Sequence, residues 1–134
     1  MAATLPEVSG AFGENPTLTF PESAPPKGLH VSVLKEGTSP TVQSGREIEV
    51  NYHGQVWGGG IFDSSFQRGA PTSFPIGVGM VIQGWDQGIV GKNIGSRLLI
   101  SIPPEKGYGL GGHPGAGIKG TDTLVFVVDV LGMK

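Results

Sequence analysis

The stretch TLVFVVDVL, residues 123–131, decides the fold class. Side chains alternate between the two faces of a strand, and here both faces carry apolar residues. Such a strand needs cover on both sides, so we place it at the centre of a β-sheet. The rest of the chain supplies the neighbours of this strand.

Apolar residues alternate with others in residues 29–33, 48–56 and 98–102, and Ile61-Phe62 begins a further short strand after three glycines. Alternation of this kind predicts half-buried strands. A single helix is predicted at residues 82–92, where Ile82, Trp85 and Ile89 form one apolar stripe. Its three glycines each cost about 1 kcal/mol relative to alanine, so the helix requires a sheet to lie on. The pattern predicts an α+β fold with a largely antiparallel sheet of five or six strands.

Composition excludes several classes of protein. The chain has 134 residues, enough for one domain, and its 24 glycines and 11 prolines lie between apolar runs, as expected for turns. Without cysteine it can form no disulfide or thiolate site. A net charge of -2 without a basic stripe argues against nucleic acid, and no apolar stretch approaches the ~20 residues of a membrane helix. We expect a cytoplasmic monomer; the alternative location is that of a secreted domain whose signal was removed.

The chain divides into an N-terminal arm, residues 1–28, and a domain, residues 29–134. The arm is rich in Pro, Ala, Gly and Ser. Leu18 and Phe20 alternate with threonines, which predicts one short strand that packs on the domain. No metal or cofactor is expected: the three histidines fit no ligand spacing, Ser64-Ser65 lacks the context of a nucleophile, and the glycine-rich segments 91–93 and 107–112 match no phosphate loop.

Several aromatic residues lie at unusual positions and remain as candidates for a functional site. Tyr108 lies in a glycine-rich loop, where burial in a core is unexpected, although a plain hydrophobic core explains most of the others. The motifs around them resemble FKBP-type peptidylprolyl isomerases over residues 29–131. In chain order they are Tyr52-x-Gly54, Phe62-Asp63-Ser64-Ser65, Val81-Ile82-Gln83-Gly84-Trp85, Ile102-Pro103-Pro104, Gly107-Tyr108-Gly109 and Thr123-Leu124-Val125-Phe126. The arm, through Val8-Ser9-Gly10 and Phe12-Gly13, resembles extensions of actinobacterial members.

The resemblance implies a sheet wrapped around one short helix, with an apolar pocket between them. It assigns Trp85 to the pocket floor. It assigns the walls and rim to Tyr52, Phe62, Phe126, Val81 and Ile82. Phe74, His113 and Ile118 are further ligand-binding residues, the last two on a loop over the pocket.

The polar groups implied by the resemblance are few. The Ile82 N–H and the Tyr108 hydroxyl would donate to a ligand carbonyl, and Asp63 would lie beside the bound imide with Arg68 and Tyr52 as partners. Two positions depart from the family pattern: Thr72 replaces an aromatic residue and opens one wall, and Met80 replaces a common acidic residue.

The implied activity is cis–trans isomerisation of X–Pro bonds in unfolded or flexible polypeptides. It requires no nucleophile, because an apolar pocket favours the twisted imide over the more polar planar form. The macrolides tacrolimus and rapamycin are the implied ligands. The alternative is a peptide-binding or chaperone module that has the same pocket but weak catalysis.

Overall fold

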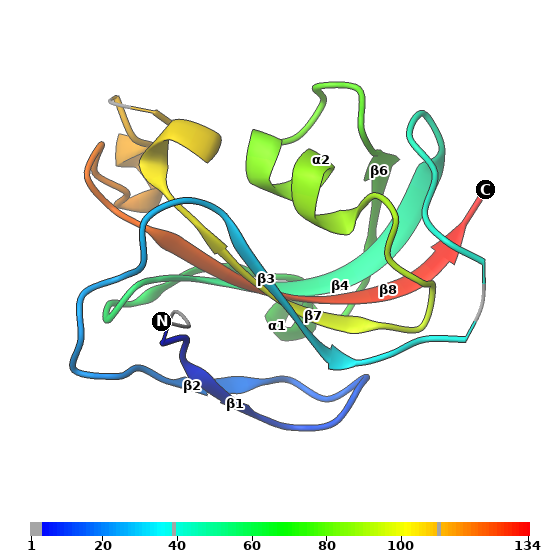
Figure 1. The fold of residues 1–134 in the computed structure, drawn as a ribbon, viewed down its shortest axis with the longest axis horizontal. Helices are drawn as coiled ribbons and strands as arrows, with labels where there is room; N and C mark the ends of the chain where they lie inside the picture. Colours follow the sequence, from blue (N-terminus) through cyan, green and yellow to red (C-terminus); the bar gives the residue numbers. More distant parts are fainter. Residues whose placement is uncertain (1–3, 39, 110) are drawn as a thin grey trace.

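The computed structural model describes residues 4–38, 40–109 and 111–134. Met1 to Ala3 of the arm and Leu110 of the glycine-rich loop lie outside the described residues. The main feature is a six-stranded antiparallel sheet in the order β3-β7-β8-β4-β5, with β6 also paired to β4 (Figure 1). Its strands are β3 (His30–Lys35), β4 (Glu47–Val56), β5 (Ile61–Ser64), β6 (Thr72–Pro75), β7 (Arg97–Ile102) and β8 (Leu124–Met133).

The strand β8 lies between β7 and β4, which confirms its predicted central place. Leu124, Phe126 and Val128 on one face belong to the main core, whereas Val125 and Val127 belong to a second cluster on the other face. All five are at most 3% exposed. The two-sided apolar pattern of the sequence thus reflects cover on both faces of the sheet.

Helix α2 (Gln83–Ile89) lies across one face of the sheet (Figure 1). A Cβ atom on Gly84 would come within 2.6 Å of Ile102 Cδ1, so glycine permits the close approach of helix and strand. The predicted end at Lys92 is wrong: Val90 is extended and Gly91 has φ +88°, which ends the helix at Ile89. Among the described residues, no helix has both the length and the apolar character required to cross a membrane.

The prediction of a single helix is also wrong. Helix α1 (Ser65–Arg68) follows β5 directly, and short 3₁₀ turns η1 (Pro104–Lys106) and η2 (Pro114–Ala116) lie in the long loop before β8. Helix α1 begins where the Ser64 hydroxyl accepts the Gln67 N–H, and it ends at Gly69, which has φ +76°. Caps of this kind set the ends of a helix too short for an apolar stripe.

The arm forms a hairpin of β1 (Glu7–Ser9) and β2 (Thr17–Thr19), which lies on the face of the sheet opposite α2 (Figure 1). The prediction of one arm strand is therefore wrong: β1 carries a single apolar residue, Val8, which is too few to show a repeat in the sequence. The prediction that the arm packs on the domain is confirmed. Its apolar side chains contact Leu99, Val125 and Val127; they are Leu5, Val8, Leu18 and Phe20.

A buried ion pair fastens the arm to the sheet. Arg97 on β7 and Asp129 on β8 are 2% and 0% exposed, with Nε and Oδ1 2.7 Å apart. The Arg97 guanidinium also donates to the carbonyls of Gly10 (2.8 Å) and Glu14 (2.5 Å), and the Gly13 N–H donates to Asp129 Oδ2 (2.8 Å). These contacts satisfy charges whose burial would otherwise be costly.

Candidate active site

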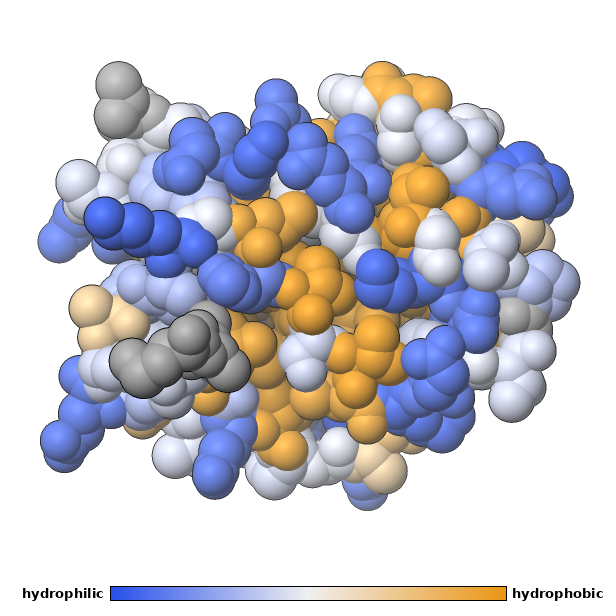
Figure 2. Space-filling model, in the orientation of Figure 1, coloured by the Kyte–Doolittle hydropathy of each residue, from blue (hydrophilic) through white to orange (hydrophobic). Residues whose placement is uncertain are grey.

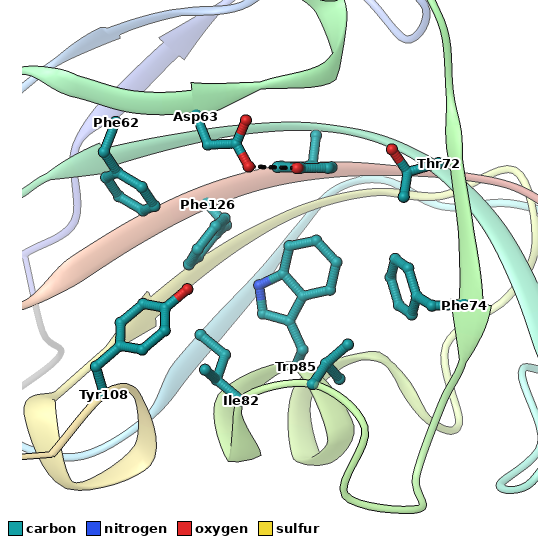
Figure 3. A pocket seen from close by; sticks show the side chains of 10 residues that line it. Phe62, Asp63, Thr72, Phe74, Ile82, Trp85, Tyr108 and Phe126 are labelled. Atoms are coloured by element: carbon teal, nitrogen blue, oxygen red, sulfur yellow. Dashed lines mark hydrogen bonds between the residues drawn. The ribbon is translucent and has the colours of Figure 1, made fainter. Parts of the chain in front are cut away.

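A hollow of about 530 Å³, open mouth included, lies between α2 and the concave face of the sheet (Figure 3). Four strands, α2, the loop before α2 and the loop after η1 supply its lining: Tyr52, Phe62, Asp63, Thr72, Phe74, Val81, Ile82, Trp85, Tyr108 and Phe126. The seven residues that the sequence assigned to catalysis all line this pocket, as do Phe74 and Val81 of the ligand-binding set. Residues separated by more than 70 positions in the chain thus converge on one cavity.

Trp85 stands at the centre of the aromatic cluster and is 6% exposed. Its ring centroid lies 5.2 Å from Tyr52, 5.1 Å from Phe126 and 5.2 Å from Phe74. The first two contacts are nearly perpendicular, an arrangement that the quadrupoles of aromatic rings favour. The interlocked rings give the pocket a fixed apolar floor.

Gly54 makes room for two of the walls. It lies on β4 opposite Phe126 and Asp63, and a Cβ atom there would lie 2.8 Å from ring carbons of both Phe126 and Phe62. Any larger residue would displace these rings, which meet at 5.4 Å and 88°. The Tyr52-x-Gly54 motif therefore combines one wall residue with the space that two others occupy.

Asp63 is the only carboxylate in the pocket lining. Its Oδ2 accepts the Tyr52 hydroxyl at 2.5 Å, and its Oδ1 forms an ion pair with Arg68. Arg68 also donates to the Tyr52 oxygen at 3.1 Å and to Thr72 Oγ1 at 3.4 Å. The predicted partners of Asp63 are confirmed. The side chains of Asp63 and Arg68 are 41% and 49% exposed, so the pair lies at the pocket mouth rather than deep inside.

The tyrosines at the pocket keep their protons more tightly than usual. Burial, followed by the hydrogen bond to Asp63, raises the pKa of Tyr52 above its ordinary value. Burial, followed by the negative charge of Asp63, raises the pKa of Tyr108. The hydrogen bonds that Arg68 donates to Tyr52 and then to Asp63 raise the pKa of its guanidinium. Both hydroxyls therefore remain donors at neutral pH, and the Tyr108 hydroxyl points into the pocket (Figure 3).

Two further donors belong to the same cavity. Ile82 precedes α2, its carbonyl accepts the N–H groups of Trp85 and Asp86, and its own N–H has no partner within the described part of the chain. The indole Nε1 of Trp85 is buried and likewise lacks a conventional acceptor among these residues. An apolar cavity with a few unsatisfied donors suits a ligand that presents a carbonyl oxygen.

Three of the predicted ligand-binding residues do not line the pocket: Arg68, which pairs with Asp63 at its mouth, His113 and Ile118. His113 is exposed, and its ring packs edge-on against Tyr108 with centroids 5.0 Å apart. Ile118 is 3% exposed and belongs to the main core, so its predicted place over the pocket is wrong. The two residues exchange backbone hydrogen bonds (2.8 and 3.1 Å), a bridge that accompanies the inward position of Ile118.

Thr72 is a lining residue that the sequence flagged only as a departure. Its hydroxyl accepts from Arg68, so it joins the polar edge of the pocket, where an aromatic residue would add apolar wall. Thr72 and Phe74 lie in one extended segment between Pro71 and Pro75, and this segment was the signal for the position of Thr72.

Comparisons with known proteins agree with this geometry. Residues 39–131 match the model of the family described as FKBP-type peptidyl-prolyl cis-trans isomerase. An "FK506-binding protein" of Streptomyces anulatus is 40% identical over 119 residues, which cover 88% of this chain and 96% of that protein. The chloroplastic peptidyl-prolyl cis-trans isomerase FKBP13 of Arabidopsis thaliana is 41% identical over 127 residues, 90% of this chain and 59% of that protein.

Solved structures show the same fold. A crystal structure of AtFKBP13 superposes with a TM-score of 0.74 at 36% identity, covering 81% of this chain and 95% of that one. Fold, pocket and sequence define a class of enzymes that isomerise peptidyl-prolyl bonds. The chain belongs to the FKBP-type peptidyl-prolyl cis-trans isomerase family.

Proposed function

We propose that the pocket accelerates rotation about X–Pro bonds by stabilising the twisted imide without covalent chemistry. The proposal rests on the aromatic cavity around Trp85, which is closed at its floor. Asp63, Tyr108 and the Ile82 N–H lie at the edge of this cavity. Rotation breaks amide resonance and lowers the charge separation of the imide. An apolar cavity therefore favours the twisted form, while the Tyr108 hydroxyl and the Ile82 N–H donate to a flanking carbonyl.

The required energy is within reach of such a site. An acceleration of about 10⁴ to 10⁶ corresponds to about 5 to 8 kcal/mol of transition-state stabilisation. The uncatalysed event takes tens to hundreds of seconds. Desolvation together with one or two hydrogen bonds supplies energies on this scale. Asp63 contributes a fixed charge beside the reacting group, oriented by Tyr52 and Arg68.

Substrates are proposed to be proline-containing polypeptides, and macrolides such as tacrolimus and rapamycin are proposed as ligands. A relative's name, FK506-binding protein, supports the second proposal. Thr72 in place of an aromatic wall removes apolar contact, so a large macrolide should bind more weakly than it does to a Thr72→Phe variant. Isothermal titration of the two proteins measures this difference.

A protease-coupled assay on a chromogenic Leu-Pro peptide tests the activity. The proposal expects turnover that rapamycin inhibits, with a change in Trp85 fluorescence on binding in a Trp57→Phe background. Absence of turnover despite rapamycin binding would favour a peptide-binding or chaperone module with the same pocket.

A further inference from the structure

The loop between β6 and α2 exposes apolar side chains beside the pocket. Residues 76–82 read IGVGMVI and carry no charge. Val78 is 53% exposed and Met80 is 68% exposed, the highest value among the large apolar residues described as exposed. Orange atoms gather at the upper edge of the molecule, where this loop lies (Figures 1 and 2). We call Val78 and Met80 the apolar rim.

This exposure is fixed by the backbone of the loop. The Asp86 carboxylate on α2 accepts the N–H groups of Gly77 (2.7 Å) and Gly79 (2.9 Å). These glycines have φ of +83° and +78°, which other residues rarely adopt. Because the residues on either side of Val78 are anchored to the helix, the apolar rim is held at the surface instead of folding onto the core.

The apolar rim is continuous with the pocket, since Val81 and Ile82 line the cavity. Successive Cα atoms are 3.8 Å apart, so the Cα of Met80 lies at most about 7.6 Å from that of Ile82. An extended peptide advances roughly 3.3 Å per residue, so this distance corresponds to about two residues of substrate. A side chain two residues from a proline in the pocket can therefore reach Met80.

We propose that the apolar rim binds an apolar side chain two residues away from the isomerised proline, outside the X–Pro pair, and so determines substrate specificity. The inference rests on the proposed isomerase function. The loop itself carries no charged side chain, and the Asp86 oxygens already accept two amides, so a charged substrate side chain finds no counter-charge within the loop. Desolvation of a substrate lysine or glutamate there would go uncompensated, which disfavours such substrates.

Two peptide series test the rim, each with a constant Leu-Pro pair. Leu, Ala, Lys or Glu stands two residues before the proline in one series and two residues after it in the other. In at least one series, wild-type kcat/KM should be five-fold or more higher for Leu than for Lys. Met80→Glu should lower that Leu-to-Lys ratio at least five-fold, because the new carboxylate pairs with lysine. Leu34→Glu, at a residue 41% exposed on β3, is the matched control and should leave the ratio unchanged.

An unchanged Leu-to-Lys ratio in Met80→Glu, or an equal shift of this ratio in Leu34→Glu, would overturn the proposed role of the apolar rim. Binding of the same peptides, followed by Trp85 fluorescence in the Trp57→Phe background, separates the rim from the activity. A rim-dependent preference in binding without any turnover would contradict the isomerase function and retain the rim. Turnover without rim dependence would contradict the role of the apolar rim and retain the isomerase function.

Discussion

The two faces of the sheet are built from the same strands, but their ion pairs differ in burial and in the contacts that they make. On the arm face, Arg97 and Asp129 are buried and bonded to each other and to three backbone groups of the arm. On the α2 face, the ion pair of Asp63 and Arg68 is half-exposed at the mouth of the aromatic pocket. One face has completed its contacts within the chain, whereas the other keeps donors and apolar surface for a ligand.

The difference predicts a separation of effects. Changes under the arm should act on the free energy of unfolding, because no arm residue that the structure describes lines the pocket. Changes in the pocket should act on the rate, because a half-exposed ion pair contributes only about 0–1 kcal/mol to stability. Each variant below tests whether the two faces can be disturbed separately.

The largest effect is expected from Asp129→Asn. The substitution keeps the shape of the side chain but leaves the buried Arg97 guanidinium without its counter-charge, which costs about 3–5 kcal/mol. Urea unfolding measures this loss, and kcat/KM at low temperature should stay within two-fold of wild type. A variant as stable as wild type would show that the arm face is not the stabilising one.

Gly54→Ala should lower both the stability and the activity by an intermediate amount. The added methyl group would collide with the rings of Phe62 and Phe126, and overpacking of this kind costs about 1–3 kcal/mol. Because these rings are pocket walls, kcat/KM should fall as well. Gly60→Ala just before β5, where no atom lies within 4 Å of the new Cβ and φ is not left-handed, is a control for the methyl group without a collision. Similar activity of the two variants would contradict the role of Gly54.

Tyr108→Phe should lower kcat/KM about three- to ten-fold, the value of one hydrogen bond of about 0.5–1.5 kcal/mol. The ring and its contact with His113 remain, so the melting temperature should hardly change. Steady-state kinetics and thermal unfolding on the same samples provide the measurement. An unaltered rate would remove the Tyr108 hydroxyl from the mechanism.

The smallest effect is expected from pH. The pKa values of Tyr52 and Tyr108 lie above the ordinary value of 10, chiefly because the partial desolvation of each hydroxyl disfavours its charged form. Both hydroxyls therefore stay protonated, and kcat/KM should be constant from about pH 7.5 to 9.5. A group whose folded pKa is raised stabilises the fold below its unfolded pKa, so this stability should be lost only as the pH rises beyond about 10. A fall in rate near pH 8.5 would contradict the assignment.

The sequence predicted those features that rest on repeated signals. The central place of β8 followed from apolar residues on both of its faces, and the pocket lining followed from several motifs in register. Helix α1 and strand β1 were missed because each is only three or four residues long and depends on caps or on its partner strand. Neither segment has a second apolar residue from which a period could be read, as Leu18 and Phe20 provided for the equally short β2.

Tertiary contacts decided the remaining cases. Ile118 faces the core, and only the structure shows its bridge with His113. The ion pair with Arg97 went unpredicted, although a signal was present: Asp129 is the one charged residue within residues 123–131, and a charge at the centre of a sheet needs a partner. Apolar strands with a single charge therefore merit a search for the opposite charge on a neighbouring strand.

The central claim is that the pocket speeds X–Pro rotation by fixed electrostatics and desolvation. The most direct test is kcat/KM of Asp63→Val on a chromogenic Leu-Pro peptide, measured beside its free energy of unfolding. The account predicts a fall of ten-fold or more, about 1.4 kcal/mol, with a change in stability below about 1 kcal/mol and a smaller loss of rapamycin affinity than of rate. Wild-type turnover in Asp63→Val would contradict it.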